Sequence, residues 1–126
     1  MTVLIDSGVW IEYWKGGSSA KAAARYIEGD ENAIVSTINL AEVFFWVSGY
    51  YDETAAQRKL LTIEKRCNAI PVEKEIAIEA AKIKKNEKLA LADSLILATA
   101  RRVRAKLVTG DSDLKGKDQV IFLSRS

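Results

Sequence analysis

The sequence predicts an α/β domain built around a parallel sheet. Short β-branched runs alternate along the chain with longer segments in which apolar residues recur at helical spacing, and this alternation is typical of βαβ units. The chain has 126 residues, 48% of them hydrophobic. Folding a chain of this length buries roughly two thirds of its unfolded surface, which is enough for a core without disulfides. No repeat or linker interrupts the pattern, so we expect residues 1–126 to form a single domain.

About five strands and six helices account for the alternation. The predicted strands comprise residues 2–5, 33–36, 69–72, 106–110 and 120–123. The predicted helices comprise residues 8–15, 20–29, 37–50, 52–67, 73–88 and 89–105. Each element follows from its own local pattern and from the residues that bound it.

Breaking and capping residues delimit these elements in order. The "GGSS" at 16–19 ends the first helix and caps the second. Asp52 caps the fourth helix, and Pro71 predicts an edge position for the third strand, because proline cannot donate to a sheet ladder. The helix at 89–105 is the most apolar one, and residues 111–119 are predicted to form a loop before the last strand.

Composition restricts the compartment and the partners. Cys67 has no second cysteine to pair with, which suits a reducing compartment. The amino terminus lacks the basic region and long apolar stretch of a signal peptide, so we expect a cytoplasmic protein. The longest apolar runs, such as "VFFWV", fall far short of the roughly 20 residues that cross a bilayer, so we expect no membrane span. The net charge of +2 says little by itself about an anionic partner.

Acidic residues stand where predicted strands end or on apolar helix faces. Asp6 follows the first strand, Asp111 follows the fourth, and Glu42 lies in the second turn of the helix after the second strand. Ligands of open α/β sheets bind outside the carboxyl ends of the strands, so we expect these side chains to meet there. Asp93 has apolar neighbours three and four residues away on both sides. A carboxylate on such a face costs several kcal/mol unless it is paired, hydrogen-bonded or bound to metal.

Each acid also has a purely structural interpretation. Asp6 could cap the following helix, and Asp111 could form an ordinary turn in "GDSD". Asp93 could cap a helix that begins at Ser94, with "LALA" in the preceding loop. Glu42 has the weakest structural interpretation, because it lies inside a helix and no basic partner is obvious. The coincidence of four acids at one end of one sheet favours a functional site.

Such a cluster predicts a hard divalent cation. Neighbouring carboxylates repel one another and raise each other's pKa values unless a cation neutralises them. All-oxygen ligation suits Mg²⁺ or Mn²⁺. The sequence has no histidine and one cysteine, which removes the usual zinc ligands and the histidine-based triads. Hydrolysis at this site is therefore expected to use metal-activated water.

Four segments resemble the motifs of a known family. They are "VLIDSGVW", "INLAEV", "LALADSLILATA" and "LVTGDSDL". In order and spacing they resemble the four motifs of PIN-domain nucleases, and more narrowly those of the VapC-type ribonuclease toxins. The resemblance covers essentially the full length of the chain.

The resemblance implies a set of site residues, matched position by position. The metal-binding and catalytic acids would be Asp6, Glu42, Asp93 and Asp111, with Asp113 as an additional metal ligand. Ser7 and Thr109 would be supporting hydroxyl groups. Leu114 stands where an aromatic residue is common, a departure that we expect to affect packing rather than chemistry. Whether Asp111 or Asp113 is the closer ligand stays open.

The resemblance also implies a fold, an activity and partners. The fold would be a three-layer α/β/α arrangement with a central, mostly parallel sheet of about five strands. The activity would be Mg²⁺- or Mn²⁺-dependent endoribonuclease cleavage of RNA by a homodimer, blocked by the tail of a small VapB-like antitoxin. Two alternatives remain, a housekeeping RNA-processing PIN nuclease and a non-catalytic RNA-binding PIN-like domain.

Two surface features have more than one interpretation. Aromatic residues crowd the helix at 8–15, and they could form an interface or belong to the core. Lys84, Lys85 and Lys88 precede the Asp93 helix and are candidates for contacts with RNA phosphates. Lysines that alternate with glutamate are also typical of a solvated helix face.

Overall fold

A five-stranded parallel sheet forms the centre of the computed structural model, which describes residues 1–124. The strands are β1 (Thr2–Ile5), β2 (Asn32–Ser36), β3 (Asn68–Ile70), β4 (Lys106–Thr109) and β5 (Val120–Phe122). Their order in the sheet is β3-β2-β1-β4-β5, and all four pairings are parallel. The first strand of the chain is therefore the central strand, where Leu4 pairs with Leu107 of β4.

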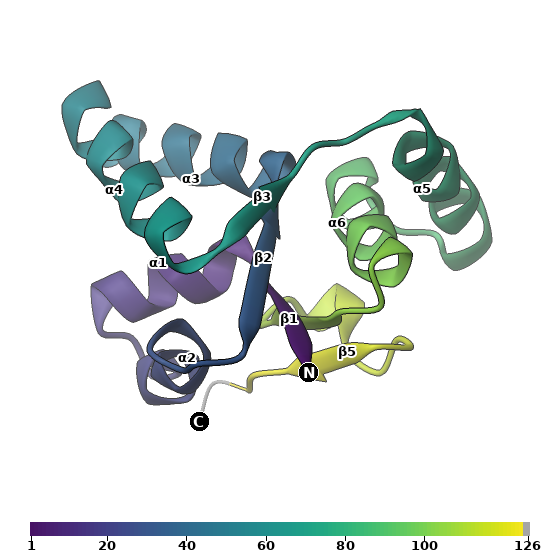
Figure 1. The fold of residues 1–126 in the computed structure, drawn as a ribbon, viewed down its shortest axis with the longest axis horizontal. Coiled ribbons are helices and arrows are strands. Elements are labelled where there is room, and N and C mark those ends of the chain that lie inside the picture. Colours follow the sequence, from purple (N-terminus) through teal and green to yellow (C-terminus); the bar gives the residue numbers. More distant parts are fainter. Residues whose placement is uncertain (125–126) are drawn as a thin grey trace.

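Helices cover both faces of this sheet (Figure 1). Within residues 1–124 they are α1 (Ser7–Lys15), α2 (Ala20–Ile27), α3 (Thr37–Tyr50), α4 (Glu53–Arg66), α5 (Lys74–Glu87) and α6 (Leu91–Arg102). Buried residues of α1 to α4 form one core with the sheet, and buried residues of α5 and α6 form a second. The three-layer α/β/α arrangement is thus confirmed. No helix in the same range is long and apolar enough to cross a membrane.

The central strand contributes to both cores. Successive side chains of a strand point to opposite faces, so Val3 and Ile5 pack with α1 to α4 while Leu4 packs with α5 and α6. All three side chains are fully buried, and each burial of this kind stabilises the fold by roughly 1.5–3 kcal/mol. Burial on both faces explains why this strand is an uninterrupted apolar run rather than an alternating one.

The predicted elements are confirmed, with small differences at their ends. Helix α6 begins at Leu91 rather than two residues earlier, and β3 lies at the edge of the sheet. The segment predicted as a loop after β4 contains a short 3₁₀ turn, η1 (Ser112–Leu114). Leu114 is fully buried in the core that includes residues of α5 and α6, so this residue has a packing role.

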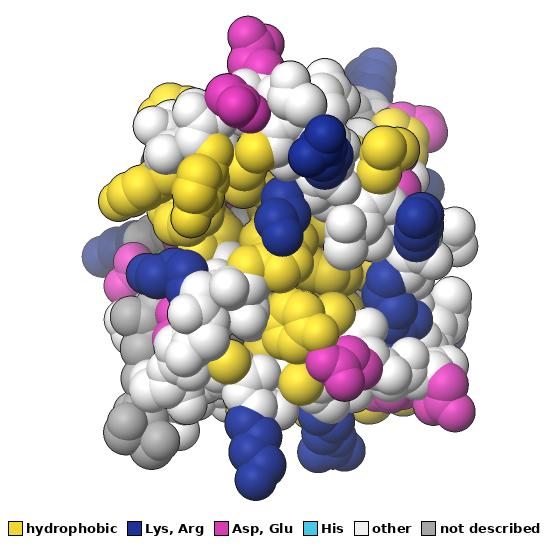
Figure 2. All heavy atoms as spheres, turned by 90° about the vertical axis from the view of Figure 1, so that its left-hand side faces the viewer, with side chains coloured by type: hydrophobic (Ala, Val, Ile, Leu, Met, Phe, Trp, Pro, Cys, Tyr) yellow, Lys and Arg dark blue, Asp and Glu magenta, His cyan; other side chains and the backbone are white. Residues whose placement is uncertain are grey.

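The aromatic residues of α1 divide between the core and its edge. Trp10 is 1% exposed and belongs to the core, whereas Tyr13 and Trp14 are partly buried and pack against it. The ammonium of Lys59 lies 4.6 Å from the centre of the Trp14 ring. Figure 2 shows that hydrophobic side chains remain visible across the middle of this face of the molecule, between scattered basic ones.

Candidate metal and active site

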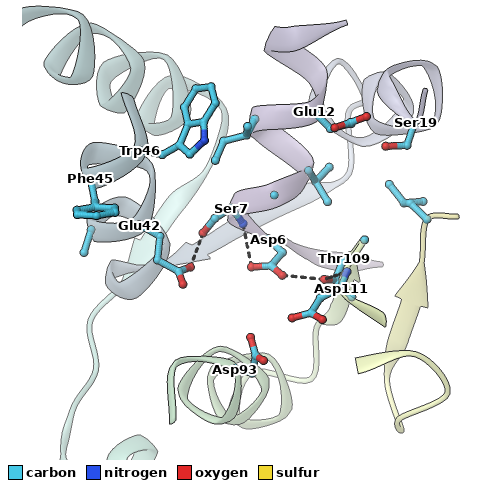
Figure 3. A pocket seen from close by; sticks show the side chains of 16 residues that line it. Asp6, Ser7, Glu12, Ser19, Glu42, Phe45, Trp46, Asp93, Thr109 and Asp111 are labelled. Carbon is cyan, nitrogen blue, oxygen red and sulfur yellow. Dashed lines mark hydrogen bonds between the residues drawn. The ribbon is translucent and has the colours of Figure 1, made fainter. Parts of the chain in front are cut away.

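The four predicted acids line one cavity at the carboxyl ends of the central strands. The cavity has a volume of about 600 Å³, and its lining includes Asp6, Glu42, Asp93 and Asp111 (Figure 3). Asp6 follows β1 directly, and its amide donates to Val108 O at 3.0 Å, which extends the ladder between β1 and β4. The parallel pairing of these strands carries Asp6 and Asp111 to the same edge of the sheet. Helices α3 and α6 then bring Glu42 and Asp93 to it.

Asp6 is fixed by hydrogen bonds to both of its oxygens. Oδ1 accepts from the Ser7 amide at 2.8 Å and from Asn39 Nδ2 at 3.1 Å, while Oδ2 accepts from Thr109 Oγ1 at 2.7 Å. The bond from Ser7 makes Asp6 the cap of α1, so the capping interpretation is confirmed. Each carboxylate oxygen can accept two bonds. The bonds formed within residues 1–124 leave one lone pair of Oδ2, which a cation could use.

A buried asparagine connects Asp6 to the rest of the site. Asn39 Nδ2 also donates to Ser7 Oγ at 2.9 Å, and Ser7 Oγ donates to Glu42 Oε1 at 2.7 Å. Asn39 Oδ1 accepts from the Ser36 amide at 2.8 Å, as part of a capping box at the start of α3. Asn39 was not among the residues predicted from the sequence. The signal was an amide three residues before Glu42, on the helix face that meets the sheet.

A second residue missed from the sequence is the acid Glu12. It lies on α1, is 8% exposed, and lines the cavity on the side away from Glu42, next to Ser19 (Figure 3). Gly17 packs directly on its carboxylate, because a Cβ at position 17 would lie 1.8 Å from Glu12 Oε1. The glycine pair after α1 therefore permits a close approach as well as ending the helix. An acid within the aromatic "WIEYW" was the available signal.

Asp93, Asp111 and Asp113 form the tightest acidic group. One carboxylate oxygen from each lies within 4.8 Å of the others. Two oxygens bound to one Mg²⁺ at 2.0–2.1 Å can be at most about 4.2 Å apart, so small side-chain rotations would suffice for a shared cation. Asp111 lines the cavity, whereas Asp113 is exposed and lies outside the lining.

Of the structural roles considered for Asp93 and Asp111, one is wrong and the other is observed. Helix α6 begins at Leu91 with Ala90 as its cap, so Asp93 lies within the first turn and the interpretation as a cap before Ser94 is wrong. Asp111 does form a turn, because its Oδ1 accepts from the Asp113 amide at 2.9 Å. That bond engages one of its two carboxylate oxygens.

Burial and mutual repulsion raise the pKa values of two acids. Burial raises the pKa of Asp6 to about 6; the charges of Glu42 and Asp111 add to this, while the bonds from Thr109 and Ser7 oppose it. Burial also raises the pKa of Asp93 to about 7, with further contributions from Asp111, Asp6 and Glu42. A divalent cation among these groups would favour their charged forms. The donor set therefore fits a hard cation.

No lysine or arginine of residues 1–124 lines this cavity, whose wall consists of acidic, hydroxyl, glycine and apolar residues. Lys84, Lys85 and Lys88 are exposed at the end of α5 and in the turn before α6, outside the lining. Lys84 Nζ lies 3.4 Å from Leu89 O. Their role as RNA contacts stays a prediction.

Comparison with models of protein families shows which family has this fold and site. The model of the PIN domain matches residues 3–119. The chain belongs to the PIN-domain family. Of the acids that the resemblance implied for this PIN domain, Asp6, Glu42, Asp93 and Asp111 line the cavity together with Glu12, whereas Asp113 lies outside the lining.

Solved structures with the same PIN fold come from several bacteria. A toxin-antitoxin complex from Klebsiella pneumoniae is 27% identical, with a TM-score of 0.81 over 98% of this chain and 99% of that one. VapBC2 from Rickettsia felis, bound to a DNA fragment from its promoter, is 19% identical, with a TM-score of 0.76 over the whole of both chains. VapC20 from Mycobacterium tuberculosis, a toxin that cleaves the sarcin-ricin loop, is 14% identical, with a TM-score of 0.75 over 92% and 95%. Comparison with curated proteins gives no match.

Proposed function

We propose that this PIN domain is a Mg²⁺- or Mn²⁺-dependent endoribonuclease and the toxin of a VapBC-type toxin-antitoxin pair. The observation that carries the proposal is the convergence of Asp6, Glu42, Asp93 and Asp111 on one cavity that no described basic side chain lines. Membership of the PIN-domain family supports a nuclease. The similarity to the Klebsiella pneumoniae toxin-antitoxin complex supports the toxin role.

The acids share the binding of the cation in the proposed mechanism. Asp93, Asp111 and Asp6 would hold the cation, with Glu42 and Asp113 as further ligands at its margin. The bound cation would supply charge neutralisation at the phosphate and a water of lowered pKa. Thr109 and Asn39 hold the Asp6 carboxylate in one orientation.

Glu42 is held for a complementary task. Ser7 donates to one of its oxygens at 2.7 Å, and the other oxygen can accept a hydrogen bond from water in the cavity. The carboxylate is thereby positioned to orient the attacking water and to receive its proton. We assign Ser7 the task of fixing this rotamer.

Substitution of the acids tests the nuclease proposal. Asp6→Asn and Asp93→Asn should each reduce Mn²⁺-dependent cleavage of RNA by at least about a hundredfold, because each removes a charged ligand. Asp30→Asn, at an exposed acid outside the cavity, is the matched control and should cleave like the wild type. A wild type that cuts no RNA, or an Asp6→Asn variant that cuts normally, contradicts the proposal.

Growth and binding experiments separate the toxin from the alternatives. A toxin should arrest the growth of a host, the Asp6→Asn variant should relieve the arrest, and a small reading frame next to the gene should encode a neutralising antitoxin. An RNA-processing enzyme should cleave without arrest. A non-catalytic RNA-binding domain should give no heat when Mn²⁺ is added in a calorimeter.

The proposal also includes the compartment and the oligomeric state of the protein. We expect a cytoplasmic homodimer. Cys67 is buried, and burial raises the pKa of its thiol to about 11, so the group is kept as an unreactive thiol. Light scattering after size-exclusion chromatography measures the oligomer directly, and a monomer would contradict that part of the proposal.

A further inference from the structure

One large aromatic side chain projects from the helix that carries Glu42. Phe45 is 81% exposed and belongs to the lining of the acidic cavity. It follows Glu42 by three residues on α3, a spacing that puts two side chains on the same helix face about 5–6 Å apart. Figure 3 shows the Phe45 ring beside Glu42, at the margin of the cavity.

The neighbouring aromatic residues are anchored, whereas Phe45 is not. Trp46 is partly buried against the core and packs on Tyr50, with 4.6 Å between ring centres. Within residues 1–124, no aromatic ring packs on Phe45. With 81% of its surface exposed, the ring is accessible to a ligand that enters the cavity.

The residues that line the cavity limit the interactions that could hold such a ligand. The described part of the lining contains no lysine or arginine, so its side chains cannot neutralise the phosphates of a nucleic acid. Proteins that bind single-stranded nucleic acids combine basic contacts to the backbone with stacking of the bases on aromatic side chains, and the stacking tolerates any sequence. Of these two kinds of contact, the described lining offers the aromatic one. Phe45 is the exposed ring that the cavity offers.

We propose that Phe45 stacks on an unpaired base of the RNA strand, next to the phosphate that lies at the acids. This inference rests on the proposed ribonuclease function and adds a substrate-binding residue to it. Because a base must be unstacked to lie on a side chain, the substrate is single-stranded at this point.

Binding of two matched probes tests the contact. The first probe is a labelled oligoadenylate RNA of about ten nucleotides, and the second is an abasic ribose-phosphate chain of equal length, which has the same charge and no bases. Dissociation constants are measured by fluorescence anisotropy on the Asp6→Asn background, so that the probe stays intact. Phe45→Leu removes the ring, Phe45→Tyr retains it, and Tyr51→Leu, at another exposed aromatic residue outside the lining, is the matched control.

The expected pattern is specific to stacking. Phe45→Leu should weaken binding of oligoadenylate by roughly five- to a hundredfold, whereas Phe45→Tyr and Tyr51→Leu should leave it nearly unchanged. The abasic chain should bind weakly and equally to all variants. Equal oligoadenylate binding by Phe45→Leu and Tyr51→Leu overturns the inference, and so does an equal loss on both probes.

Cleavage, measured separately without the Asp6 substitution, distinguishes this inference from the proposed function. Cleavage by a protein whose RNA binding ignores Phe45 overturns the inference alone. Binding that depends on Phe45 without any cleavage overturns the nuclease proposal alone. If Phe45→Leu binds RNA normally but loses its antitoxin, the ring serves a protein partner and the inference is also overturned.

Discussion

Asp6 caps α1 and faces the acidic cavity with the same carboxylate. Three hydrogen bonds hold it in place, yet burial still raises its pKa to about 6. Desolvation therefore outweighs the stabilisation that these donors give to the charged form. In the metal-free protein, ionisation of the buried Asp6 carboxylate therefore lowers the free energy of unfolding, and the size of this effect depends on pH.

The metal-free protein should lose stability as the pH rises. The pKa values of Asp6 and Asp93 are about 6 and about 7 in the folded protein, against an ordinary value of 3.8. Between about pH 4 and pH 7 the folded state binds more protons than the unfolded state, so the free energy of unfolding decreases with pH. Urea unfolding in a chelator should give a lower midpoint at about pH 8 than at about pH 5.

Asp6→Asn provides the control for this pH dependence. The amide cannot ionise, so its midpoint should vary less with pH, and the variant should be more stable than the wild type at about pH 8 by about 1–3 kcal/mol. A wild-type profile as flat as that of the variant would contradict the expectation.

Asn39 should be needed for both stability and metal affinity. Asn39→Ala removes donors from Asp6 and Ser7 and leaves the buried Ser36 amide without its acceptor, which should cost about 1–3 kcal/mol. Loss of such an orienting residue should also weaken Mn²⁺ binding by about 10–100-fold, measured by calorimetry. Asn86→Ala, at an exposed position of α5, is the control. If Asn39→Ala bound Mn²⁺ as tightly as the wild type, Asn39 would contribute to stability alone and the prediction about metal affinity would be wrong.

At the scale of elements, Arg66 joins the end of α4 to the end of α2. Its guanidinium donates to Tyr26 O at 2.9 Å, to Ile27 O at 3.0 Å and to Glu31 O at 2.8 Å. The last carbonyls of a helix have no partner within the helix, and a positive charge is favourable there. One side chain therefore satisfies the end of α2 and the turn that leads into β2.

Arg66→Met should destabilise the fold without changing the site. The loss of these charge-assisted bonds should lower the free energy of unfolding by about 2–4 kcal/mol, which corresponds to a fall in Tm of roughly 10 °C for a chain of this size. Arg58→Met, at an exposed position of the same helix, should have little effect on Tm. Mn²⁺ affinity at low temperature should be unchanged in both, and a marked loss in Arg66→Met would indicate a coupling that its contacts do not explain.

Local patterns explain which elements could be predicted from the sequence. The run before Asp6 is apolar because both faces of its strand are buried, and the glycines after α1 break the helix, so both features are local. Asn39, the contacts of Arg66 and the order of the strands depend on residues distant in sequence. Asp111 was a turn candidate, but the 3₁₀ turn at Ser112–Leu114 was predicted only as a loop, because two backbone bonds, Leu114 N to Asp111 O at 3.0 Å and Lys115 N to Ser112 O at 3.2 Å, make a turn too short to leave a periodic pattern.

The acids could be predicted for a different reason. Parallel strands deliver their carboxyl ends to one edge, so residues that follow strands meet there whatever the strand order. Glu12 reaches the cavity from the second turn of α1, where Gly17 packs on its carboxylate. Because it does not follow a strand, the positions of the strand ends could not predict it.

A divalent cation that binds the folded chain should stabilise the whole fold by an amount that rises with the logarithm of its concentration relative to its Kd. At a concentration of about 100 times its Kd, Mn²⁺ should raise the free energy of unfolding by about 2.7 kcal/mol. Protons compete for the same oxygens, so the rise in Tm at fixed Mn²⁺ should be larger at about pH 8 than at about pH 5.5. Asp93→Asn should show a smaller rise at both pH values. An equal rise in this variant would place the cation elsewhere.

The central position of β1 also sets the time at which the acidic cavity can form. Asp6 and Thr109, which share a hydrogen bond, are 103 residues apart. At a translation rate of about 5–20 residues per second, roughly 5–20 s separate the synthesis of these two residues. Until β4 has left the ribosome, β1 lacks one of its two neighbours and Asp6 lacks the donor to Oδ2. A nascent chain therefore carries the first acid of the site long before it can assemble the site itself.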